Sequence, residues 1–255
     1  MSAPSPPPRR AVLFDLDDTL VPWHSVAHWQ WAWRPQGPVL SERHSLAAIR
    51  RALHRWDRRR WQGLVGALAP VTADDLRNAL REELFEIAGH PLPPAETEAV
   101  VDRFLKPAGE TESYPDVVPT LAALTERGLR LGTVTDLPSA PAHRALKRAA
   151  LPEDLLLLDG EAPEARLPSA AAFRRAAARL GVKPRECLYV GDLFWSDVRA
   201  AGRAGFAAVL LDRPDAQPKV TGARIRSLAD VPALLDAPAT LPSPSDSDAS
   251  SGPVP

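Results

Sequence analysis

The feature that most constrains the fold is a regular alternation of short apolar runs with helix-like segments in the second half of the chain. Strands that alternate with helices favour a doubly wound parallel sheet, covered by helices on both faces. An apolar run of the same kind stands near the N-terminus. We therefore predict an α/β fold, with strands at 11–15, 129–135, 155–159, 187–192 and 206–212 and helices at 116–127, 139–150, 169–180 and 196–204.

The composition excludes several classes of protein. With 45% apolar and 25% charged residues, the 255-residue chain has globular composition. The 31 basic residues nearly balance the 32 acidic ones, so we expect no nucleic-acid or membrane-surface partner. No apolar run approaches the length of about 18 residues typical of a membrane span, and the N-terminus lacks the apolar stretch of a secretory signal. The single Cys187 excludes a disulfide framework and fits a cytoplasmic location.

Proline usage predicts where the folded part begins and ends. Of the 28 prolines, nine lie in the segments 1–10 and 237–255, which are poor in large apolar side chains. Such segments bury too little surface to offset the entropy of ordering, so we predict two disordered tails. Residues 21–112 have helical character throughout. We predict that they form a helical insertion in a core made of 11–20 and 113–236.

Polar side chains stand at the ends of three predicted strands. Asp15 and Asp17 follow the first strand, Thr135 ends the second, and Asp192 and Asp197 follow the fourth. In parallel α/β sheets these strand ends share one edge, where ligands bind. Crowded carboxylates repel one another unless a cation or a shared proton relieves them, and their oxygens suit Mg²⁺. The alternative is that each residue only caps a helix or closes a turn. This alternative is reasonable for any one of the five residues but improbable for all five together.

These residues resemble the motifs of the haloacid dehalogenase (HAD) superfamily, mostly phosphohydrolases on a Rossmann-like core. The resemblance covers 11–20 and 113–212 and says little about 21–112. The stretch Asp15-Leu16-Asp17-Asp18-Thr19 is similar to the first motif, DxDxT, Thr135 to the second, and Gly191-Asp192 with Asp197 to the fourth.

The resemblance implies a Mg²⁺-dependent phosphohydrolase acting on a small phosphorylated metabolite. Asp15 would take the phosphoryl group as an aspartyl phosphate, and Asp17 would protonate the leaving oxygen and then activate water. Asp15, Asp192 and the backbone carbonyl of Asp17 would hold Mg²⁺, with Asp197 holding its water shell or binding directly. Thr135 would bind a phosphoryl oxygen. The acid at Asp17 favours phosphoester hydrolysis, because a leaving halide needs no proton.

The third motif of the family departs from its usual form. Relatives place a lysine before a proline and a helical phenylalanine, and alignment on Pro168 and Phe173 puts Leu167 in the lysine position. Arg166 is the neighbouring cation and a candidate phosphate ligand, although Arg and Lys are not equivalent. Lys147 is a weaker substitute. Without such a cation the carboxylates would repel the phosphate and turnover would fall. The alternative hypothesis is therefore a catalytically weak HAD-fold protein that binds a phosphorylated ligand or a protein partner.

The insertion corresponds in the family to a helical cap that closes over the site and sets specificity. It contains six of the seven tryptophans, which we interpret mainly as its core, the alternative being an aromatic or sugar-like substrate surface. Residues 42–62 carry a net charge of about +5 and residues 72–112 about −6. The basic stretch is suited to attract an anion, but we expect the two stretches to face water or each other.

Overall fold

The computed structural model describes residues 8–22, 42–64, 73–88, 91–105, 112–159, 169–213, 217 and 222–236. The predicted tails therefore lie outside the described residues, apart from 8–10. The described chain forms one six-stranded, all-parallel sheet in the order β3-β2-β1-β4-β5-β6. Its strands are β1 Ala11–Phe14, β2 Arg130–Val134, β3 Leu156–Leu158, β4 Cys187–Gly191, β5 Ala207–Leu211 and β6 Arg224–Ile225. The five predicted strands are confirmed, and β6 was not predicted because two residues carry no pattern.

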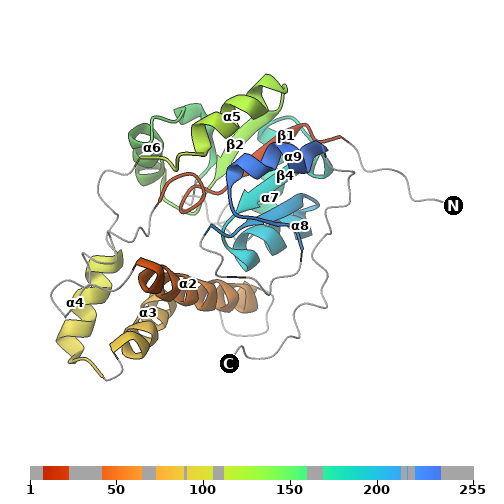
Figure 1. Cartoon of the computed structure of the whole chain (residues 1–255). Coiled ribbons are helices and arrows are strands. Elements are labelled where there is room, and N and C mark those ends of the chain that lie inside the picture. The colour runs from red at the N-terminus through yellow and green to blue at the C-terminus, as the bar shows by residue number, and fades with distance from the viewer. Residues whose placement is uncertain are drawn as a thin grey trace.

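Helices cover both faces of the sheet, as the alternation predicted (Figure 1). Helices α5, α6 and α9 pack on one face and α7 and α8 on the other. The turn that precedes α8 is π-helical and is called the π turn below. The bounds are α5 Val117–Glu126, α6 Ser139–Arg148, α7 Ala170–Arg179, the π turn Phe194–Arg199, α8 Ala200–Ala204 and α9 Val231–Asp236.

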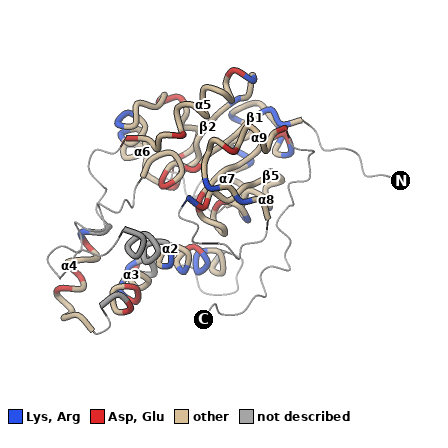
Figure 2. The backbone as a smooth tube through the Cα atoms, in the orientation of Figure 1, with Lys and Arg blue, Asp and Glu red and all other residues tan. Residues whose placement is uncertain are grey.

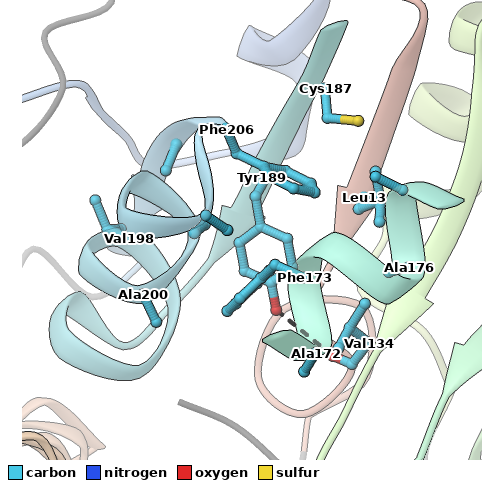
Figure 3. Close-up of a cluster of buried hydrophobic side chains, with 14 of the residues drawn as sticks. Leu13, Val134, Ala172, Phe173, Ala176, Cys187, Tyr189, Val198, Ala200 and Phe206 are labelled. Carbon is cyan, nitrogen blue, oxygen red and sulfur yellow. Dashed lines mark hydrogen bonds between the residues drawn. The ribbon is translucent and has the colours of Figure 1, made fainter. Parts of the chain in front are cut away.

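The central strand β1 is buried on both faces, which explains its uninterrupted apolar sequence. Its side chains alternate, so Phe14 enters the core beneath α5 and α6 while Leu13 enters the core beneath α7. In the second core Phe173 meets Tyr189 edge to face, with ring centroids 4.7 Å apart (Figure 3). This packing holds α7 against β4, and the backbone ladder between β1 and β4 aligns the residues that follow both strands.

Three helices lie between β1 and α5, and they are α2 Glu42–Leu64, α3 Ala73–Ala88 and α4 Pro94–Leu105. In Figure 1 they lie below the sheet, with α2 nearest to it. Arg51 and Arg55 of α2 form ion pairs with Glu83 of α3, whose side chain is only 1% exposed. We expected the basic and acidic stretches to face water or each other, and these half-exposed arginines do both; Figure 2 shows both charges along the two helices.

The order of the strands defines where a ligand can enter. Strand β1 pairs with β2 on one side and with β4 on the other, so the chain reverses its direction of winding between β1 and β4. Such a switch point opens a crevice outside the carboxyl ends of the two strands. None of the described helices has the length and apolar character needed to cross a membrane.

Candidate active site

The loop that follows β1 is a tight turn that presents two carboxylates. The backbone N–H of Val21 donates to the carbonyl of Leu16 at 3.0 Å, and that of Asp18 donates to the carbonyl of Val21 at 2.6 Å. Asp18 occupies the left-handed region with φ of 56°, which Asp tolerates better than most residues. The turn thus holds Asp15 and Asp17 at the carboxyl end of β1, where the sequence predicted them.

The end of β4 is built around a close approach between backbone and side chain. A Cβ at Gly191 would overlap the carboxylate of Asp197, so only glycine leaves room for it. That carboxylate accepts hydrogen bonds from the backbone N–H of Leu193 at 2.9 Å and from the hydroxyl of Tyr189 at 3.4 Å. Asp197 lies in the π turn, a conformation frequent at functional sites. Asp192, directly after Gly191, is also buried.

Three carboxylates from these two loops converge. Asp15, Asp192 and Asp197 each offer an oxygen, and the three oxygens lie within 4.8 Å of one another. Among the described residues this group does not include the side chain of Asp17, for which the resemblance implies a ligand at the backbone carbonyl. An all-oxygen, acidic and largely buried donor set fits a hard divalent cation such as Mg²⁺.

The carboxylates raise one another's proton affinity. Burial, then the charges of Asp197 and Asp192, raise the pKa of Asp15 well above its usual range. Burial, followed by Asp136 and Asp18, likewise raises the pKa of Asp17. Burial and Asp192 do the same to the pKa of Asp197. A raised pKa keeps Asp17 protonated at higher pH, as an acid catalyst requires, while the others need a cation to ionise together.

We expect Mg²⁺ to stabilise the protein more as pH rises. In the metal-free protein these carboxyls keep protons that the unfolded chain releases from about pH 3.8 upward, so native stability falls as pH rises through this window. Mg²⁺ needs the ionised form and reverses that loss. The increase in Tm with Mg²⁺ over EDTA should be larger by about 4 °C or more at about pH 8 than at about pH 5.5. An equal increase at both pH values would contradict the assignment.

The end of β2 adds a hydroxyl and one carboxylate that the sequence reading missed. Thr135 is buried, and its Oγ1 accepts from the backbone N–H of Leu137 at 3.2 Å, which leaves the hydroxyl proton to offer a ligand. The backbone N–H of Thr135 donates to the carbonyl of Leu158 at 3.1 Å, so the hydroxyl is the group that Thr135 can offer to a ligand. The next residue, Asp136, contributes to the raised pKa of Asp15. Thr135 was selected because it is a polar residue at the end of a strand, and the same argument applies to Asp136.

The structure describes only some of the residues that were considered as the cation that binds the phosphate. Arg166 and Leu167 lie outside the described residues, whereas Phe173 is buried on α7 as the alignment expects. Lys147 is exposed in the last turn of α6, at the far end of the helix from Thr135. Arg60 of α2 instead brings a positive charge to this edge of the sheet, since its Nη1 lies 3.0 Å from a carboxylate oxygen of Asp136.

The comparisons with known proteins agree with this geometry. The model of the haloacid dehalogenase-like hydrolases matches residues 9–205. Glyceraldehyde 3-phosphate phosphatase of Methanopyrus kandleri is 32% identical over 220 residues, which are 80% of this chain and 84% of that protein.

Two solved structures share the fold. A HAD family hydrolase of Deinococcus radiodurans, solved with phosphate and sodium, has a TM-score of 0.63 at 20% identity and covers 92% of this chain and 98% of its own. L-2-haloacid dehalogenase of Xanthobacter autotrophicus has a TM-score of 0.58 at 18% identity, covering 90% and 99%. The sheet order, the converging carboxylates and the family match lead to one conclusion. This chain belongs to the haloacid dehalogenase-like hydrolase family and is a hydrolase.

Proposed function

We propose that this protein is a Mg²⁺-dependent phosphatase that hydrolyses a small phosphorylated metabolite through an aspartyl phosphate. The observation that carries the proposal is the convergence of Asp15, Asp192 and Asp197, with Asp17 on the same loop as Asp15. A relative named as a phosphatase supports the choice of phosphoester over halide, as does the acid at Asp17.

In the first step a carboxylate oxygen of Asp15 attacks phosphorus. The new O–P bond forms as the ester P–O bond breaks, and its electron pair goes to the leaving oxygen, which takes the proton of Asp17. In the second step the ionised Asp17 accepts a proton from water, whose oxygen bonds to phosphorus. The bond to Asp15 breaks, and phosphate leaves. The raised pKa of Asp17 supports this exchange of acid and base roles.

The remaining residues of the proposed site would bind the cation and orient the phosphate. Asp15, Asp192 and Asp197 would hold Mg²⁺, with the backbone carbonyl of Asp17 as a further ligand. When bound, Mg²⁺ offsets the repulsion between these carboxylates and the phosphate. The hydroxyl of Thr135 donates to a phosphoryl oxygen, and Arg166 is a further candidate ligand for it.

We also propose that residues 21–112 form the cap of the enzyme. Supporting this division, helices α2, α3 and α4 lie together outside the sheet, and α2 reaches the edge that bears the carboxylates. A cap in this position excludes water from the reaction and selects the substrate. The core would then comprise 11–20 and 113–236.

We expect the purified protein to release phosphate from p-nitrophenyl phosphate with Mg²⁺, and to lose at least about 99% of that rate in EDTA, since charge neutralisation is worth several kcal/mol. A panel of phosphorylated metabolites would then identify the substrate, and 2-chloropropionate with a halide assay serves as the control. Chloride release without phosphate release would contradict the proposal. Binding of phosphorylated metabolites without turnover would favour the catalytically weak alternative.

A further inference from the structure

A buried carboxylate on the inserted helices has no part in the mechanism above. Asp57, in the middle of α2, is 1% exposed. Burial raises its pKa to about 6, although hydrogen bonds from the core and the charge of Arg60 act in the opposite direction. An acidic group is expensive to bury unless its partners are well placed, so the surroundings of Asp57 deserve an explanation.

Within the described part of the chain, the hydrogen bonds to the Asp57 carboxylate come from the π turn. One carboxylate oxygen accepts the backbone N–H of Trp195 at 2.8 Å, and the other accepts the backbone N–H of Ser196 at 2.8 Å together with the Ser196 hydroxyl. The contact joins residues 138 and 139 positions apart in the chain. It therefore fastens the inserted helix to the loop that carries Asp197, at the two residues directly before that carboxylate.

Neighbouring side chains on the same face of α2 extend this contact. Arg60, three residues after Asp57, pairs with Asp136 beside Thr135. Trp61, four residues after Asp57, packs on Trp195 with ring centroids 6.0 Å apart. Residues spaced by three and four lie on one helix face, so these contacts form and break together when α2 moves.

We propose that Asp57 is a positioning residue for the metal site, because it holds the turn that aims Asp197 at the cation. Seating of α2 on the core and binding of Mg²⁺ are then coupled. The inference rests on the proposed function only in requiring that Asp15, Asp192 and Asp197 bind a divalent cation. Coupling of this kind is reciprocal, so Mg²⁺ must strengthen the seating of α2 by the same factor by which seating strengthens Mg²⁺ binding.

The test is Mg²⁺ binding to the full chain by calorimetry, without substrate. Asp57→Ala should raise the Kd for Mg²⁺ about tenfold or more, because two N–H groups and a hydroxyl lose their acceptor. Asp57→Asn keeps one acceptor oxygen and should show a smaller increase, about threefold. Ser196→Ala, which removes one bond from the core side, should also raise the Kd, and by less in the Asp57→Ala background than in wild type.

Glu83→Gln is the matched control. Glu83 is an equally buried carboxylate of the inserted helices, but it pairs with Arg51 and Arg55 rather than with the core. This variant should lower Tm and leave the Kd for Mg²⁺ within about twofold, which separates loss of stability from loss of positioning.

Hydrogen exchange supplies the reciprocal measurement. Mg²⁺ should slow exchange in α2 of wild type about tenfold and have little effect there in Asp57→Ala. A Kd that Asp57→Ala leaves unchanged, in a wild type that binds Mg²⁺, would overturn this inference alone. Failure of the wild type to bind Mg²⁺ at all would overturn the proposed function as well.

Discussion

Asp15→Asn is expected to lower the phosphatase kcat by at least about 10⁴-fold, because an amide cannot attack phosphorus and no covalent intermediate forms. The substitution is nearly isosteric and removes a carboxylate whose ionised form is disfavoured by burial and by the charge of Asp197. The metal-free variant should therefore fold and gain stability at neutral pH. Steady-state rates with p-nitrophenyl phosphate and thermal unfolding in EDTA measure the two effects.

Asp18→Asn is the control for this substitution. Asp18 lies in the same turn and is also buried, but it accepts a hydrogen bond from the Tyr114 hydroxyl at 3.3 Å and does not belong to the converging group. Asn tolerates the left-handed conformation at this position and keeps an acceptor oxygen. The charge of Asp18 contributes to the raised pKa of Asp17 only after burial and Asp136, so we expect kcat within about fivefold of wild type. Activity that survives Asp15→Asn would refute Asp15 as the nucleophile, whereas a large loss in Asp18→Asn would show that a changed charge in this turn is enough to impair the site.

Gly191→Ala is expected to reduce Mg²⁺ affinity and kcat each by about a hundredfold. The added methyl group would occupy the space of the Asp197 carboxylate, which would lose its hydrogen bond from Leu193 and turn away from Asp15 and Asp192. Loss of one charged ligand weakens a hard-cation site strongly, because few carboxylates hold the ion. Calorimetry with Mg²⁺ and the phosphate-release assay would measure both losses.

Gly132→Ala provides the matched comparison. A Cβ at Gly132 would meet the side chain of Leu157, an apolar core contact between β2 and β3. Overpacking of this kind costs about 1–3 kcal/mol, so the variant should unfold at lower temperature. Its Mg²⁺ affinity should remain near that of wild type. If both glycine variants weaken Mg²⁺ binding equally, the effect of Gly191 is one of general stability.

The sequence predicted the sheet because a strand buried on both faces leaves a recognisable apolar run. It also predicted the carboxylates of the two loops, since strand ends in a parallel sheet converge on one edge. Asp136 was within reach of the same rule and was missed. By contrast, no local pattern marks β6, whose two residues depend on pairing with β5.

The roles of Asp57 and Arg60 could not be predicted from the sequence. In the sequence they belong to an arginine-rich helix, where most of the charges are expected to face solvent or α3. Their roles depend on which helix face meets the π turn, a contact that spans more than half of the chain. The spacing of apolar residues in a helix predicts which face is buried, but it does not predict which element packs against that face. Such contacts are therefore visible only in the three-dimensional structure.

The central position of β1 has a consequence for how the protein is made. Its two neighbours, β2 and β4, begin at residues 130 and 187, so β1 leaves the ribosome long before either can pair with it. The loop that carries Asp15 is thus synthesised about 180 residues before Asp197, the last member of the converging group of carboxylates. Both edges of β1 are unpaired until β2 is made, and one edge stays unpaired until β4 follows; an unpaired edge of an apolar strand is prone to aggregation. A nascent chain halted before β4 should require chaperone protection, and one extended past β5 should not.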